Sequence, residues 1–275
     1  MSALSAPTTH SRLADVFESC KQQQRSALVS YLTAGDPDFN TSKELLLALA
    51  EQSDILEIGM PFSDPMADGP VIQAASERAL AAGTHIADVF KLTASVRAAH
   101  PDLAIVLMGY ANVPYAIGFD DFAARAKEAG ADAVLIVDIP PEEGHICDTA
   151  LKTHGLDRIL LLSPTSTDER IQLACDYASG FIYYVSLTGI TGADMGDMQS
   201  IHQKVDHIKS ICGELPVCVG FGVKTPAQAA QVASFADGVV VGSHFVSHIT
   251  DARNKADIRA ALSASASSMR KAVGV

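Results

Sequence analysis

The chain has 275 residues, of which 48% are hydrophobic and 19% charged, and its formal net charge is -12. This length and composition allow one large core, and (β/α)8 barrels commonly have about 250 residues. The negative charge argues against nucleic acid or an anionic membrane as a partner, because both would be repelled at long range. No apolar run reaches about 18 residues, so no membrane-spanning segment is predicted.

Residues 1–10 are rich in Ser, Thr and Ala and lack the features of a signal or transit peptide, so we expect a loose extension there. The cysteines are scattered at Cys20, Cys147, Cys175, Cys212 and Cys218, with no CxxC pair. This usage is typical of a reducing compartment, which predicts a cytoplasmic protein whose thiols serve as small core residues. A zinc site or a disulfide is not expected.

Eight short apolar runs alternate with helical stretches along the whole chain. Each run is rich in Val, Ile or Leu and is bounded by Gly, Pro, Asp or Ser. The runs are 27–33, 55–59, 104–108, 133–137, 159–162, 181–186, 217–220 and 238–242. Strands that are apolar on both faces are typical of a parallel sheet covered by helices on each side.

Helical stretches with recognisable ends lie between these runs. They include 41–50, 71–82, 120–129 and a helix that begins with a capping box at 225–228. Further helices are expected at 11–25, closing the bottom of the barrel, and at 256–273. Eight βα units without a linker favour a single closed (β/α)8 barrel domain over residues 1–275, with an extra N-terminal helix. An open doubly wound sheet is the alternative.

The stretch 56–70 combines a strand with a proline-rich loop and carries two prominent acids. Glu57 lies inside the predicted strand, where a carboxylate is costly unless it is paired or used. Because strand side chains alternate, Leu56 and Ile58 should meet the outer helices while Glu57 points into the barrel. Asp68 follows in the loop. Two such acids suit general acid and base catalysis, whereas a half-solvated or salt-bridged Glu57 is the structural alternative.

Glycines follow the sixth, seventh and eighth apolar runs. They are Gly189 and Gly192, then Gly220 and Gly222, then Gly242 beside Ser243. In barrels the site lies on the loops after the strands, and exposed backbone N–H groups there can bind a phosphate without a lysine. Glycine also ends strands for purely conformational reasons. Three such loops together predict a phosphate site, with no role assigned to the flanking Lys224 and His244.

Several segments, in order along the chain, resemble the tryptophan synthase alpha subunit family. The specific one is the stretch 56–70, Leu-Glu-Ile-Gly-Met-Pro-Phe-Ser-Asp-Pro-Met-Ala-Asp-Gly-Pro. It is accompanied by Thr33-Ala-Gly-Asp-Pro-Asp, Tyr110-Ala-Asn112, Asp138-Ile-Pro-Pro-Glu-Glu, Ser186-Leu-Thr-Gly-Ile-Thr-Gly192, Gly220-Phe-Gly222 and Gly242-Ser243. The resemblance covers nearly the whole chain. It implies a lyase of tryptophan biosynthesis that cleaves indole-3-glycerol phosphate, by a retro-aldol reaction, to indole and glyceraldehyde 3-phosphate.

The resemblance also implies roles for individual residues. Glu57 would shuttle protons between the indole ring carbon and the adjacent side-chain hydroxyl, and Asp68 would accept a hydrogen bond from the indole N–H. The phosphate would bind at Gly192, Gly222, Gly242 and Ser243. Tyr183 would line the site, although a barrel-packing aromatic is the alternative. By position, the candidates for the apolar indole slot are Tyr31, Ile72, Met108, Leu135 and Phe221, and residues 186–199 would form a lid.

The same resemblance implies a partner, a beta subunit that carries pyridoxal phosphate and receives indole through a tunnel in an alpha2beta2 assembly. No cofactor or metal is expected on this chain itself. After Asn112 the chain reads Val113-Pro114-Tyr115, where many relatives have a proline directly after the asparagine, so this partner-facing loop departs from the family pattern.

Three alternative functions were weighed against this one. A freestanding lyase that releases indole differs only in loop dynamics. A metal-dependent phosphosugar epimerase would need converging His and acid ligands, yet only His244 closely follows a predicted strand. An inactive subunit that only activates a partner is disfavoured by the pair Glu57 and Asp68.

Overall fold

The computed structural model describes residues 11–185, 198–220, 222–251 and 255–274. The predicted N-terminal extension, most of the predicted lid and two candidate substrate-binding residues, Gly192 and Phe221, therefore lie outside the described residues. No helix within the described ranges is both long and apolar enough to cross a membrane.

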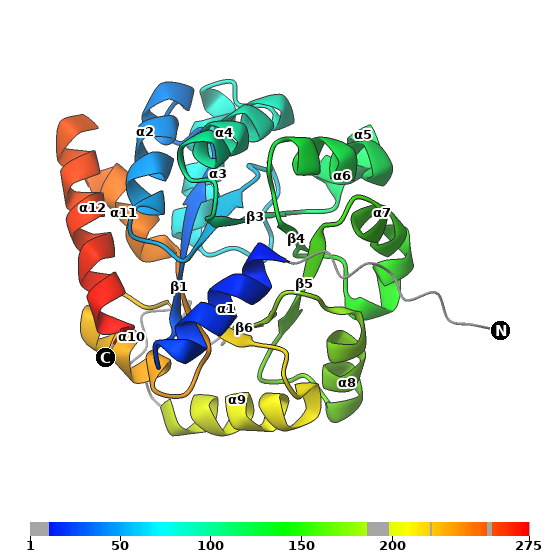
Figure 1. The fold of residues 1–275 in the computed structure, drawn as a ribbon. Helices are drawn as coiled ribbons and strands as arrows, with labels where there is room; N and C mark the ends of the chain where they lie inside the picture. The colour runs from blue at the N-terminus through cyan, green and yellow to red at the C-terminus, as the bar shows by residue number, and fades with distance from the viewer. Residues whose placement is uncertain (1–10, 186–197, 221, 252–254, 275) are drawn as a thin grey trace.

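Eight parallel strands close into one barrel in the order of the chain (Figure 1). They are β1 (Ala27–Thr33), β2 (Ile55–Gly59), β3 (Ala104–Gly109), β4 (Ala133–Ile136), β5 (Asp157–Leu162), β6 (Ile182–Val185), β7 (Val217–Gly220) and β8 (Gly238–Val241). The last strand pairs with the first, because Val29 of β1 lies in register with Val240 of β8. The predicted (β/α)8 barrel is therefore confirmed, and the open sheet is excluded.

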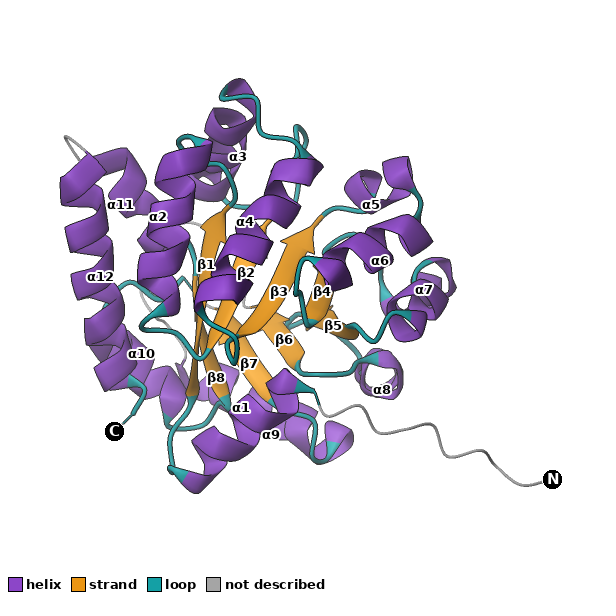
Figure 2. Ribbon diagram, turned by 45° about the horizontal axis from the view of Figure 1, so that its top comes forward, coloured by secondary structure: helices purple, strands orange, loops and turns teal. Residues whose placement is uncertain are grey.

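Helices surround the barrel on its outer face, as Figure 2 shows. They are α2 (Phe39–Ala50), α3 (Pro70–Ala81), α4 (Ile86–Ala99), α5 (Asn112–Ile117), α6 (Phe119–Glu128), α7 (Asp148–Thr153), α8 (Asp168–Tyr177), α9 (Met198–Cys212), α10 (Pro226–Ala233), α11 (Ser243–Asp251) and α12 (Lys255–Ala272), with a 3-10 helix η1 (Pro141–Ile146). The predicted capping box is confirmed, since the Thr225 side chain accepts from the Gln228 N–H and the Gln228 side chain accepts in return. Helix α2 begins earlier than predicted because Asp38 caps it.

The core has two layers, separated by the barrel wall. Leu56 and Ile58 belong to the outer layer, where the strands meet the helices. Ile55, two positions before Glu57 on the same face of β2, belongs to the layer inside the barrel. This alternation places the Glu57 side chain inside the barrel, as the sequence pattern predicted.

Helix α1 (Arg12–Gln22) lies across the end of the barrel at which the strands begin (Figure 1). Leu13, Phe17 and Cys20 are buried in the inner core layer. The Phe17 ring meets the edge of Phe181, just before β6, with ring centroids 5.8 Å apart. The predicted N-terminal helix therefore closes the bottom of the barrel with apolar side chains.

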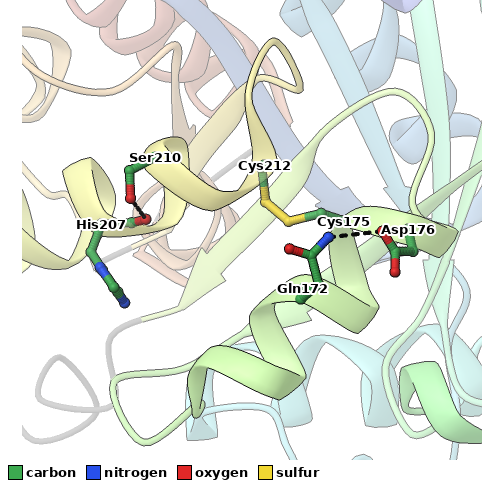
Figure 3. Close-up of a disulfide and its surroundings, with 6 residues drawn as sticks. All are labelled: Gln172, Cys175, Asp176, His207, Ser210 and Cys212. Atoms are coloured by element: carbon green, nitrogen blue, oxygen red, sulfur yellow. Dashed lines mark hydrogen bonds between the residues drawn. A yellow bond between two sulfur atoms is a disulfide. The ribbon is translucent and has the colours of Figure 1, made fainter.

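The structure corrects the expectation that all five cysteines are free thiols. Cys175 of α8 and Cys212 of α9 form a disulfide that joins two neighbouring helices (Figure 3). The pair is 37 residues apart in sequence, so no spacing rule could have found it. Cys20, Cys147 and Cys218 are free and buried, as expected.

Candidate active site

A cavity of about 560 Å³ opens at the carboxyl ends of the strands. Its wall is formed by residues that end or follow strands, including Asp68 after β2, Ser163 after β5 and Ser243 after β8. This is the end of the barrel at which the sequence analysis expected the site. Helix α1 fills the opposite end of the barrel with apolar side chains, so in the described part of the chain this cavity is the place where a ligand can approach the barrel interior.

Glu57 is buried inside the barrel, with 1% of its surface exposed. It lies in register with Tyr31 of β1 on one side and Val106 of β3 on the other. Within the described part of the chain, neither carboxyl oxygen has a hydrogen-bond partner. Burial, assisted by the charge of Asp68, raises the pKa of Glu57 to about 8. This carboxyl group therefore holds its proton at neutral pH.

Glu57 is not part of the cavity wall itself but lies next to it. Its charge acts on the phenol of Tyr183, and that side chain does line the cavity. The buried acid is therefore separated from the cavity by its immediate neighbours on the inner face of the barrel.

Asp68 lies on the cavity wall, in the loop between β2 and α3. The Tyr110 hydroxyl donates a hydrogen bond to its Oδ2 atom at 3.0 Å. Burial raises the pKa of Asp68, and the hydrogen bond from Tyr110 acts in the opposite direction. The two acids consequently have different environments, one without a hydrogen-bond donor and one with a donor, which is the arrangement that separates an acid from a base.

The candidate phosphate loops meet at one side of the cavity. Gly222, Gly242 and Ser243 all line it, and Ser243 is the first residue of α11. The first N–H groups of a helix have no partner within the helix and favour an anion. Lys224, to which the sequence analysis gave no role, and Arg170 of α8 also line the cavity. Lys224 lies two residues after Gly222 and is a candidate countercharge for a phosphate, whereas the Arg170 guanidinium is paired with Glu142.

The residues proposed for the apolar slot divide into two groups. Ile72 of α3 and Met108 of β3 line the cavity, as does Tyr183 of β6, which the resemblance separately placed at the site. Leu135 does not, because it is fully buried in the inner core layer, two positions before Val137 on the wall. Tyr31 is also absent from the wall.

Tyr31 instead contacts Glu57 and its surroundings. Its hydroxyl shares a 3.2 Å hydrogen bond with the Thr33 hydroxyl, and its ring occupies the space where Gly59 lacks a side chain. Tyr31 and Leu135 thus support the floor of the site rather than its wall.

The structure also brings in residues that the sequence analysis did not single out. Tyr110 contacts Asp68 from the neighbouring strand, and Asp138, Ser163 and Ser166 lie on the cavity wall. Tyr110 and Asp138 begin segments that support the family resemblance, but nothing in their spacing indicated a contact with the predicted site. Such contacts arise from strand neighbours far apart in sequence.

These features define a class of protein: a (β/α)8 barrel with a largely apolar cavity at the carboxyl ends of its strands and two acids placed where acid and base chemistry could occur. The described residues contain no group of three or more His, Cys, Asp or Glu side chains arranged to hold a metal ion. Asp68, the apolar wall and the glycines Gly222 and Gly242 line one cavity, and Glu57 lies next to it.

The comparisons with known proteins identify the family within this class. Residues 17–274 match the family described as tryptophan synthase alpha chain. The tryptophan synthase alpha chain of Zymomonas mobilis is 48% identical over 265 residues, covering 96% of each chain. That of Geobacter sulfurreducens is 47% identical, covering 96% of this chain and 99% of the relative. This chain belongs to the tryptophan synthase alpha chain family, as its motifs indicated.

Solved structures agree with this assignment. Tryptophan synthase subunit alpha from Legionella pneumophila superposes with a TM-score of 0.89 at 40% identity, covering 96% of this chain and 99% of that one. A structure of tryptophan synthase from M. tuberculosis, in an aminoacrylate-bound form, gives a TM-score of 0.86 at 35% identity, covering 96% and 100%. The chain is thus a lyase of tryptophan biosynthesis that cleaves indole-3-glycerol phosphate to indole and glyceraldehyde 3-phosphate.

Proposed function

We propose that Glu57 and Asp68 divide the acid and base work of this cleavage between them. The observation that supports this division is the contrast in their surroundings. Glu57 is buried without a hydrogen-bond donor and has a pKa raised to about 8, whereas Asp68 accepts a hydrogen bond from Tyr110. At neutral pH Glu57 begins the reaction as an acid and Asp68 as a carboxylate.

The reaction needs a proton at the ring carbon that bears the glycerol phosphate chain. Protonated Glu57 donates it, and the positive charge that develops on the ring is stabilised by Asp68 through the indole N–H. Glu57, now a carboxylate, removes the proton of the adjacent side-chain hydroxyl. The carbon–carbon bond breaks, its electrons return to the ring, and the hydroxyl carbon becomes the aldehyde of glyceraldehyde 3-phosphate. Glu57 recovers its proton, so the acid is regenerated.

This role requires Glu57 to reach a ligand in the cavity. Its charge acts on Tyr183, which lines the cavity, and we propose that rotation about the Glu57 side-chain bonds brings the carboxyl group to the ligand. Releasing the group from an apolar pocket also lowers its pKa. The same movement therefore favours transfer of the proton to the substrate.

We further propose how the substrate lies in the cavity. The phosphate binds the backbone at Gly222, Gly242 and Ser243, with the Ser243 hydroxyl as an additional donor and Lys224 nearby as a countercharge. The indole ring lies against Ile72, Met108 and Tyr183, and Asp68 is on the same wall. The proposal also assigns Gly192 to the phosphate, Phe221 to the indole slot and residues 186–199 to a lid. Tyr31 and Leu135 are proposed to support the site from below.

Glu57→Gln tests the assignment of the acid. The amide keeps the size of the side chain but carries no transferable acidic proton, so we expect indole formation to fall by several orders of magnitude while binding of the substrate is retained. Glu51→Gln, at an exposed position after α2, is the matched control and should keep wild-type turnover. Wild-type turnover in Glu57→Gln would reject the role.

A beta subunit that carries pyridoxal phosphate is the proposed partner, in an alpha2beta2 assembly through which indole is channelled, and no cofactor is proposed for this chain. The support is family membership, together with the relative from M. tuberculosis whose structure is that of tryptophan synthase in an aminoacrylate-bound form. The test is indole formation by the purified chain, alone and with an added beta subunit. Slow turnover that rises strongly with the partner supports the assembly, and fast turnover that the partner does not change identifies a freestanding lyase.

A cytoplasmic location is also proposed. A phosphorylated substrate carries a charge that keeps it from crossing membranes, and Cys20, Cys147 and Cys218 are free thiols. In such a reducing compartment the bond between Cys175 and Cys212 is expected to exchange with the thiol pool. Fractionation of cells that express the chain with its natural termini would test the location.

A further inference from the structure

Tyr110 occupies an unusual place beside the site. It directly follows β3 and only 2% of its surface is exposed. Its ring stacks on Phe62 of the loop after β2, with centroids 5.4 Å apart and an angle of 30° between the ring planes. The Tyr110 ring therefore has a packing contact with this loop in addition to the contacts of its hydroxyl group.

The hydroxyl of Tyr110 makes two hydrogen bonds to the loop that carries Asp68. It donates to Asp68 Oδ2 at 3.0 Å and accepts from the backbone N–H of Ala67, also at 3.0 Å. Two contacts at adjacent residues fix both the position of the loop and the plane of the carboxylate. One carboxylate oxygen of Asp68 is thereby bonded to Tyr110, and Asp68 itself lines the cavity.

We infer that Tyr110 is a positioning residue for the cleavage, which orients the Asp68 carboxylate through the hydroxyl hydrogen bond. The inference rests on the proposed role of Asp68 and adds a second residue to it. Tyr110 does not touch the reacting atoms, so its effect on the reaction passes through Asp68.

The electrostatic surroundings agree with this inference. Burial and the charge of Asp68 raise the pKa of the Tyr110 phenol, so the donor keeps its proton at every working pH. The hydrogen bond in turn lowers the pKa of Asp68 against the effect of burial. The titratable groups that interact with Asp68 are Glu57 of β2, Tyr31 of β1, Tyr183 of β6 and Tyr110 itself, and Asp138 acts on Tyr110. Lys224 and Arg170 line the same cavity.

Tyr110→Phe removes the hydroxyl and keeps the ring that stacks on Phe62. We expect kcat for indole formation to fall about ten-fold to a hundred-fold, the range for loss of a hydrogen bond to a charged group. Without the donor the pKa of Asp68 rises, so the acidic limb of the pH profile should move to higher pH. Tyr177→Phe removes the same atom at an exposed position in α8 and should leave both quantities unchanged.

Phe62→Leu separates the hydrogen bond from the packing. This variant disturbs the ring stack but leaves the hydroxyl and Asp68 in place, so its acidic limb should stay at the wild-type pH. If Phe62→Leu moves the limb as far as Tyr110→Phe does, packing explains the effect and the inference is overturned. A wild-type pH profile in Tyr110→Phe overturns it as well.

A double-mutant cycle distinguishes failure of this inference from failure of the proposed function. In an Asp68→Asn background the Tyr110→Phe change should alter kcat less than about two-fold, because the group through which it acts is gone. Wild-type turnover of Asp68→Asn alone would reject the role of Asp68, and with it this inference. Impaired Asp68→Asn together with wild-type Tyr110→Phe would reject only the inference.

Discussion

The buried carboxylate of Asp36 accepts two hydrogen bonds from the Arg78 guanidinium, each 2.8 Å long, from Nε to Oδ1 and from Nη2 to Oδ2. This pair joins the loop after β1 to α3, the helix whose first residues line the cavity. The Asp36 side chain is fully buried, whereas that of Arg78 is 31% exposed. Burial raises the pKa of Asp36 and Arg78 opposes that effect. The Arg78 guanidinium therefore stabilises the ionised form of the fully buried Asp36 carboxylate.

Arg78→Ala should destabilise the fold by about 3–5 kcal/mol, because it leaves the Asp36 carboxylate buried without its partner. Thermal or urea denaturation measures the change. Arg170→Ala breaks a similar two-point pair with Glu142 on the surface, where both side chains are about half exposed, and should cost less than about 1 kcal/mol. Equal losses in the two variants would contradict the role of burial.

Indole formation should fall as the pH rises through about 8. The pKa of Glu57 is raised to about 8 by burial and by Asp68, and the proposed first step uses its protonated form. The proton is therefore present below that pH and lost above it. A pH profile of kcat/KM for the chain alone checks this, and a flat profile up to pH 9.5 would show that Glu57 does not begin the reaction as an acid.

Asp68→Asn should move the alkaline limb of its remaining activity to lower pH. The negative charge of Asp68 contributes to the raised pKa of Glu57, and the neutral amide removes that contribution. Turnover should also fall more than substrate binding, since the ring charge appears only during the reaction. An alkaline limb that stays in place would mean that the two groups do not interact.

Ser243→Ala should weaken substrate binding mainly through the phosphate. The variant loses the hydroxyl donor at the start of α11 but keeps the backbone N–H groups, so we expect KM to rise about three-fold to ten-fold with little change in kcat. A dephosphorylated substrate analogue is the control. If the variant weakens this analogue by the same factor, the placement of the phosphate is wrong.

Reduction of the Cys175–Cys212 disulfide should lower the melting temperature of the wild-type chain. For the 37-residue separation, chain entropy gives a stabilisation of about 4 kcal/mol. The double variant Cys175→Ser, Cys212→Ser should melt at the same temperature with and without a thiol reductant. A wild-type chain whose melting is equally insensitive, with both cysteines alkylatable before reduction, would show that the bond does not form in solution.

The barrel was predictable because its strands are apolar on both faces and are clearly separated by helices and turns. Runs such as 217–220 are short, but each fills one place in a repeating βα pattern. The helices α5 and η1 were not predicted, because each has six residues and too few periodic positions to stand out. Helix α11 was not predicted, because it begins directly after the glycine that follows β8.

Site residues were predictable where the residue type itself suggests a chemical role. They were less predictable where an apolar residue belongs to the site only because of its position in space. Glu57 stood out as an acid inside an apolar strand. Leu135 and Val137 are two residues apart and share one face of the same strand region. Only Val137 lies on the cavity wall, whereas Leu135 is buried in the inner core. The Tyr110 and Asp68 contact spans 42 residues of sequence, so only the neighbouring positions of β2 and β3 bring the two together.

Helix α1 seals the barrel opposite the cavity with Leu13, Phe17 and Cys20 in the inner core. Among the described residues, the interior of the barrel is therefore filled with side chains at the end where the strands begin. The described cavity lies among the loops at the carboxyl ends of the strands, so we expect the substrate to enter, and the products to leave, across this rim. Any element that covers that rim would control both the entry of the substrate and the release of the products.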